Sequence, residues 1–152
     1  MPDNLIQIEF NPPDLLHRMR RYPKKLDDEL EEAMEAALHQ VHAKVKAYPI
    51  YESDYERQNI LGKSLGSDMH TGGRVSDSGA NLIKRHRRLG QGKYEGRFGT
   101  SLEYAQYVIG TKTQAGHMSH WWTMDEIKER AEPGIKKIFE EMTRRLVKFL
   151  GG

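Results

Sequence analysis

The chain has 152 residues, a net charge of +2 and no cysteine. It contains no apolar run near 18 residues and no basic segment followed by an apolar one near its start, so we expect neither a membrane span nor a secretory signal. Without cysteine there are no disulfides, zinc–thiolate sites, iron–sulfur clusters or thiol nucleophiles, which fits a reducing cytoplasm. So small a net charge does not by itself indicate nucleic-acid binding.

The length predicts a single domain, residues 1–152. Hydrophobic residues make up 37% of the chain and charged residues 30%. This apolar share is slightly low for a compact soluble domain. It indicates an extended shape, a long polar loop, or a core that other subunits complete.

The first elements are short. Residues 5–10, LIQIEF, alternate apolar and polar side chains, which predicts a strand with one wet face. The following Asn-Pro-Pro breaks the strand, and Asp14 is placed to cap a short helical turn through Arg21.

A long helix is predicted from Pro23, a residue suited to the first helical position, to the stop at Pro49. At about 1.5 Å per residue it is roughly 37 Å long. His39 and His42 flank its apolar stripe, and we interpret them as surface or groove residues rather than catalytic ones. The stripe consists of Leu26, Leu30, Met34, Ala37, Val41, Val45 and Tyr48.

The middle of the chain is less regular. Residues 48–57 read as a loop and residues 59–67 as a strand ending in glycine. Residues 66–92 carry six glycines, and a stretch this long without structure is usually functional or disordered. We expect a flexible or projecting arm here, as a loop or an extended hairpin. A short helix over residues 80–89 is the alternative.

The last elements are two strands and a helix. Residues 93–99 and 103–110 alternate aromatic or β-branched side chains with polar ones, which predicts strands. Residues 123–126 form a capping box that opens an amphipathic C-terminal helix. Pro133 is expected to kink or split this helix. Its apolar stripe is Ile127, Ala131, Ile135, Ile138, Met142 and Leu146.

Residues 84–88, KRHRR, are the strongest electrostatic feature. The surrounding residues 71–101 hold seven basic and two acidic side chains, a net +5. Such a run is most often a solvated surface. The functional alternative is contact with phosphates without sequence readout. The residues that would make it are Lys84, Arg85, Arg87 and Arg88.

No complete catalytic or metal-binding constellation is present in the sequence. His117 and His120 are spaced for a shared metal, but no nearby carboxylate completes the ligand set. A hydrolase or nuclease using these histidines with Glu126 is therefore the weakest hypothesis. Residues 62–64, GKS, look like the end of a phosphate loop but lack the upstream glycine. We expect no catalytic residue, no metal and no cofactor.

Three stretches, taken in order, resemble a known family. They are the long helix running into residues 47–49 (AYP), residues 55–65 (YERQNILGKSL), and residues 98–110 (FGTSLEYAQYVIG). Gln114, Ala115, His117 and Trp122 follow. This order resembles the neck or tail-completion proteins of tailed bacteriophages, which are minor tail or head–tail joining components. The likeness covers roughly residues 22–150.

The resemblance implies an α+β fold, with a small, mostly antiparallel sheet packed against one long N-terminal helix and a C-terminal amphipathic helix. It implies a structural virion protein without enzymatic activity. Its copies would form a ring, expected to be sixfold, between the head connector or stopper and the tail tube or terminator. The ring would surround the DNA channel, so the protein would reside in the virion and in the host cytoplasm during assembly.

Under this interpretation two groups of residues make contacts. Lys84, Arg85, Arg87 and Arg88 would face the lumen, where they would touch genomic DNA, or an adjacent ring. The sheet core and subunit interface would be built by Leu61, Leu65, Tyr104, Tyr107 and Val108, with Trp121 and Trp122 anchoring the sheet to the C-terminal helix. The alternative is a small nucleic-acid-binding module without sequence preference, which rests on the same basic segment.

Overall fold

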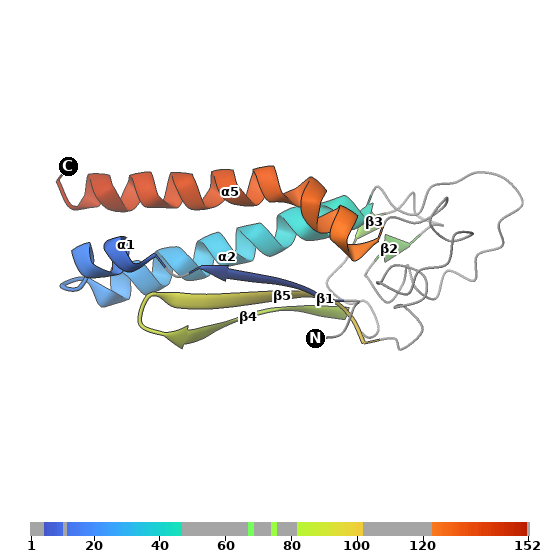
Figure 1. Cartoon of the computed structure of the whole chain (residues 1–152), viewed down its shortest axis with the longest axis horizontal. Coiled ribbons are helices and arrows are strands. Elements are labelled where there is room, and N and C mark those ends of the chain that lie inside the picture. Colours follow the sequence, from blue (N-terminus) through green and yellow to red (C-terminus); the bar gives the residue numbers. More distant parts are fainter. Residues whose placement is uncertain are drawn as a thin grey trace, which may run out of the picture.

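A computed structural model describes residues 5–10, 12–46, 67–68, 74–75, 82–101 and 123–151 (Figure 1). The fold is α+β, as predicted. The helices are α1 (Pro13–Arg18), α2 (Pro23–Lys46) and α5 (Met124–Phe149). The strands are β1 (Leu5–Phe10), β2 (Ser67–Asp68), β3 (Arg74–Val75), β4 (Leu82–Gly90) and β5 (Lys93–Thr100).

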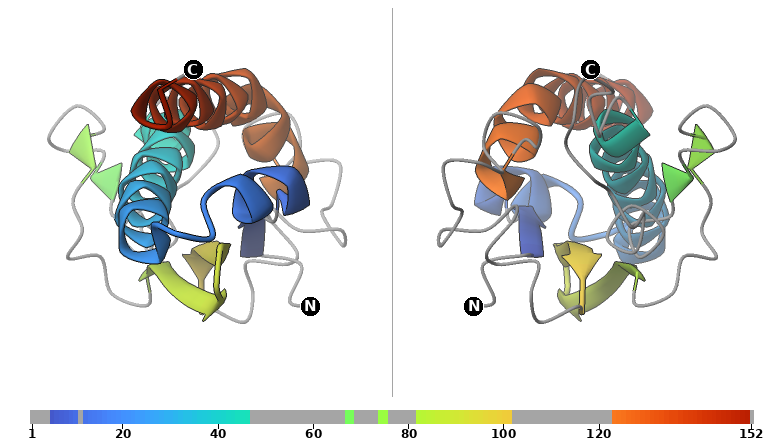
Figure 2. Two further views of the ribbon diagram at one scale, coloured as in Figure 1. Left: turned by 90° about the vertical axis from the view of Figure 1, so that its left-hand side faces the viewer. Right: turned by 90° about the vertical axis from the view of Figure 1, so that its right-hand side faces the viewer.

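The main sheet has three antiparallel strands in the order β1-β5-β4. The helices lie on one side of it (Figure 2). Ile6, Ile8 and Phe98 are buried on this side, while the intervening residues point away, as strand geometry requires. The strands predicted over residues 5–10 and 93–99 are therefore confirmed. We call the side turned away from the helices the outer face.

Helix α2 forms the centre of the core. Pro23 occupies its first position, as the sequence predicts. The stripe members Leu26, Leu30, Met34, Ala37 and Val41 are at most 1% exposed. They pack against both the sheet and α5. The side chain of Val45 and the whole of Tyr48 lie outside the described residues.

Helix α5 begins at its predicted cap, where the backbone amide of Glu126 donates to the Thr123 hydroxyl at 3.2 Å. Pro133 does not split the helix, which runs unbroken to Phe149. Its first turns bend away from the axis of the rest (Figure 1). Of the predicted stripe, Ile127, Ala131, Met142 and Leu146 are buried, and Ile135 and Ile138 only partly. Phe139 is buried as well, because its ring stacks on Phe10 with centroids 4.5 Å apart.

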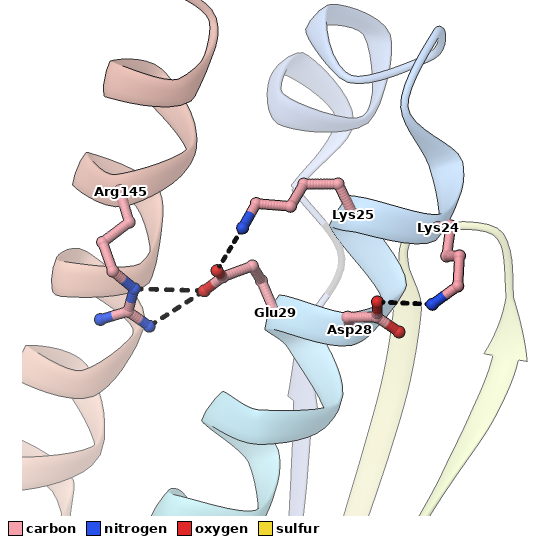
Figure 3. Close-up of polar contacts among 5 residues, drawn as sticks. All are labelled: Lys24, Lys25, Asp28, Glu29 and Arg145. Carbon is pink, nitrogen blue, oxygen red and sulfur yellow. Dashed lines mark hydrogen bonds and ion pairs between the residues drawn. The ribbon is translucent and has the colours of Figure 1, made fainter.

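A half-buried ion cluster joins α2 to α5 (Figure 3). The Glu29 carboxylate accepts from Lys25 Nζ at 3.0 Å and from Arg145 Nε and Nη2, each at 3.1 Å. Burial would raise the pKa of Glu29, but the hydrogen bonds from Lys25 and Arg145 outweigh it and lower that pKa. The neighbouring pair, Lys24 and Asp28, is exposed and lies on α2 alone. Glu29 is therefore the carboxylate that ties the two helices together.

Three expectations need correction. Residues 82–90 form strand β4, which pairs with β5 as a hairpin within the main sheet, so the helix over residues 80–89 is wrong for the described part of that segment. The short N-terminal helix ends at Arg18 rather than Arg21, and Asp14 lies in its first turn instead of capping it. Proline at position 13 takes the first helical place, which starts the helix two residues earlier than a cap at Asp14 would.

Other predicted elements lie outside the described residues. They are the loop over residues 48–57, the strand over residues 59–67 except Ser67, and the strand over residues 103–110.

Gly96 sets how closely α2 approaches the sheet. A Cβ atom there would lie 2.6 Å from Met34 Sδ and 3.2 Å from Leu38 Cδ2, and both of these side chains are buried. Gly96→Ala should therefore destabilise the fold by about 1–3 kcal/mol through overpacking, measured by urea unfolding. Gly90→Ala is the control, because its Cβ would meet only Lys93 Cδ at 4.0 Å. Equal losses from the two substitutions would contradict this packing.

Candidate functional site

The basic run lies on β4, an edge strand of the main sheet. Because side chains alternate along a strand, its four cations fall on two faces. Lys84 and Arg88 are paired in register with Phe98 and Tyr94, which are buried toward the helices. Arg85 and Arg87 point to the outer face. The structure therefore does not bring the four predicted contact residues to one surface.

Lys84 and Arg88, the inner pair of cations, connect the edge strand β4 to helix α2. Lys84 Nζ lies 2.9 Å from His39 Nδ1 and 3.1 Å from His42 Nδ1. Arg88 Nε lies 3.1 Å from Asp27 Oδ2. Both inner cations thus contact helix α2 of the same chain.

The two histidines of α2 differ in environment. His39 is exposed and lines a depression of about 250 Å³ with Glu35, Leu82 and His86, which agrees with a groove residue. His42 is only 2% exposed, with its ring centroid 5.2 Å from that of Phe98, so the surface interpretation is wrong for His42. An ammonium group can only donate, so Lys84 requires an unprotonated Nδ1 on each imidazole that accepts from it.

A buried carboxylate lies among the cations of the outer face. Glu95 on β5 is 2% exposed. Its Oε1 accepts from Arg97 Nε at 2.6 Å and its Oε2 from Arg87 Nε at 3.0 Å. Arg97 is two residues along the same strand, and Arg87 is directly opposite on β4. One carboxylate therefore orients two guanidinium groups.

The ionisation of Glu95 reflects these contacts. The hydrogen bond from Arg97 is the largest influence and lowers the pKa of the carboxyl group, burial opposes it, and Arg87 lowers it further. Glu95 is therefore ionised at neutral pH, and its charge neutralises one of the two arginines that it contacts.

Arg85 is the outer-face cation without an ion-pair or hydrogen-bond partner in the described part of the chain. It is exposed and lies directly opposite Arg97 in the strand register. Like charges directly opposite each other on neighbouring strands are unfavourable. Beside this pair is a depression of about 270 Å³, lined by Arg85, His86, Arg87, Glu95 and Arg97.

The other predicted contact residues cannot be placed. Leu61, Leu65, Tyr104, Tyr107, Val108, Trp121 and Trp122 all lie outside the described residues, and so do His117 and His120. Glu126 is described, and its backbone takes part in the cap of α5.

The described residues offer no metal centre. Within them, no three histidine, aspartate or glutamate side chains are grouped to hold an ion. No helix in the same part of the chain is both long and apolar enough to cross a membrane. The chemistry that this region can perform is charge recognition by guanidinium groups.

Comparison of the chain with protein-family models, curated proteins and solved structures gave no match. The interpretation of the site therefore rests on its geometry.

Sequence reasoning missed Glu95 and Arg97 as members of the basic site. Both fall within the segment whose charge stood out, and their spacing of two places them on one face of a strand. Only the register between β4 and β5 shows that Glu95 is opposite Arg87 and Arg97 opposite Arg85.

The two faces of β4 should respond differently to charge removal. Lys84→Gln and Arg88→Gln should each lower the free energy of unfolding by about 0.5–1.5 kcal/mol, because each breaks polar contacts with α2. Arg85→Gln should change it by less than about 0.5 kcal/mol. Urea titration at low salt measures all three. If Arg85→Gln lowers the free energy of unfolding as much as Lys84→Gln or Arg88→Gln does, the inner and outer cations do not have different roles.

The lowered pKa of Glu95 predicts a pH-dependent contribution to stability. A carboxyl group whose pKa is lower in the folded state stabilises the fold above its unfolded value, about 4.3, and loses that effect as the pH falls through the folded value. Wild type should therefore be more stable than Glu95→Gln at pH 7, and the difference should shrink below about pH 4. Unfolding curves from pH 7 to pH 2.5 test this, and a difference independent of pH would refute it.

Proposed function

We propose that this protein is a non-enzymatic structural subunit of a tailed bacteriophage, located at the neck or tail-completion position. Copies of the chain form a ring, expected to be sixfold, that joins the head connector to the tail and surrounds the DNA channel. Its neighbours are the connector or stopper on the head side and the tube or terminator on the tail side. The protein is assembled in the host cytoplasm and resides in the virion.

The observation that carries this proposal is the order along the sequence of residues 47–49, 55–65 and 98–110, which resembles that of the neck and tail-completion proteins. The α+β architecture, with a long helix against a small antiparallel sheet, is what that resemblance implies.

The described surface offers further support at one end of the molecule. The start of α2, the turn between β4 and β5, and the end of α5 all lie at this end (Figure 1). Tyr22, which directly precedes α2, and Phe149, the last residue of α5, are 46% and 47% exposed, and Leu89 of β4 is 48% exposed. Tyr22 and Phe149 contact each other edge to face, with centroids 5.0 Å apart. This exposed aromatic pair favours contact with a neighbouring protein.

A second candidate is a small nucleic-acid-binding module without sequence preference. The outer-face arginines favour it, because guanidinium groups bind phosphates and sequence-independent affinity comes from such contacts. The two candidates differ in the assembly that they require: the module functions as a monomer, whereas the neck protein functions as a ring.

Light scattering across protein concentrations, with negative-stain images of any large species, tests the proposal. We expect a closed ring with a central hole, in which Arg85→Gln/Arg87→Gln assembles like wild type, because neither outer cation contacts the helices. Lys84 and Arg88 are left unchanged in this variant, because both contact α2. A monomer at every concentration, combined with DNA binding that weakens steeply with salt, would overturn the ring and support the module.

A further inference from the structure

We propose that the outer face of the sheet holds a binding site for a phosphate group, formed by the guanidinium groups of Arg85, Arg87 and Arg97 around the buried carboxylate of Glu95. We call this set of four residues the arginine cradle. The inference goes beyond the assembly role, because a phosphate site on this face requires no particular oligomeric state.

The first supporting observation is the way in which Glu95 holds its two arginines. Its contacts are to Nε of Arg87 and Nε of Arg97. Each guanidinium group has five donors in a rigid fork, so an Nε contact leaves the Nη donors of the fork for another acceptor. Glu95 is only 2% exposed. Its carboxylate therefore holds the two arginines in place without repelling an anion at the surface. Two donor forks are thus oriented before any ligand arrives.

The second observation is the unbalanced charge of the cradle. Three guanidinium groups surround one carboxylate, which leaves a net charge of +2. Arg85 has no ion-pair partner within the described residues and lies directly opposite Arg97. An anion between the two would replace repulsion across the strands with attraction. The depression of about 270 Å³ that the cradle lines leaves room for one.

The charges on the neighbouring strand limit where the anion can bind. Glu9 on β1 is opposite Glu95 in the register, and its Oε1 accepts from Gln7 Nε2 at 2.8 Å. Gln7 in turn is opposite Arg97. The negative charge of Glu9 therefore lies on the β1 side of Glu95, and Arg85 and Arg87 on the β4 side. We place the phosphate on the β4 side, in the depression that Arg85, Arg87 and Arg97 line.

The chemistry favours phosphate over a single carboxylate. A phosphate group carries up to two negative charges, which match the net charge of +2 on the cradle. Its several acceptor oxygens can accept from three guanidinium groups that approach from different directions. The phosphate can belong to a small phosphorylated molecule or to a nucleic-acid backbone, and the experiment separates these sources.

Isothermal titration with inorganic phosphate at constant ionic strength tests the site. Arg85→Gln should weaken binding by about tenfold or more, because it removes charge-assisted hydrogen bonds. Arg85→Lys should weaken it less, because the charge is kept while the fork is lost. The matched control is Arg144→Gln, at an exposed position on α5, which should bind like wild type. Circular dichroism checks that every variant folds.

A second titration uses a short DNA duplex over a range of salt concentrations. If the phosphate belongs to a nucleic-acid backbone, Arg85→Gln weakens duplex binding as well and lowers the slope of log K against log salt by about one. If only inorganic phosphate responds to Arg85→Gln, the ligand is a small phosphorylated molecule.

The site is refuted if wild type binds neither probe, or if Arg85→Gln and Arg144→Gln behave alike. The particle mass of each variant is measured in parallel. Phosphate binding by a protein that forms no ring would refute the proposed assembly role but support the phosphate site. A ring that binds no phosphate would support the assembly role and refute the site.

Discussion

The burial of one face of α2 is the constraint on which the rest of the described structure depends. Leu30, Met34 and Val41 are fully buried between the sheet and α5, and the glycine at position 96 lets the helix lie close against the middle strand. Once this helix covers one side of the sheet, every residue of the three strands is assigned to an inner or an outer face. The side chains of β4 then alternate between the inner and the outer face, and the basic residues of the strand are divided between the two faces.

This division gives the two halves of the basic run different roles. The inner cations contact α2 through His39, His42 and Asp27, and so contribute to the attachment of the edge strand. The outer cations keep their charge at the surface, where Glu95 orients one of them together with Arg97. Because Glu95 neutralises only one of the three arginines around it, the outer face remains positive. A function that uses charge therefore belongs to the outer face and not to the run as a whole.

Much of the fold is predictable from hydrophobic periodicity. Strand β1, helix α2 and the cap of α5 follow from local patterns that tertiary contacts do not override. Strand β4 is not predictable in this way, because four of its nine residues are lysine or arginine and the glycine-rich sequence before it resembles a loop. Its place is decided by pairing with β5, a contact that no local pattern encodes. The cradle shares this property: Glu95 and Arg97 gain their importance only from the register across the strands.

The arrangement of the outer face is tested most directly by ¹⁵N NMR of the arginine side chains. If Glu95 holds Arg87 and Arg97 through their Nε atoms, the Nε–H protons of these two residues exchange slowly with water, whereas that of Arg85 exchanges rapidly. In Glu95→Gln, which keeps the shape of the side chain but has one acceptor oxygen and no charge, at least one of the two slow signals should become fast. If the Nε–H protons of all three arginines exchange equally and rapidly in the wild-type protein, Glu95 does not organise the outer face, and this arrangement is contradicted.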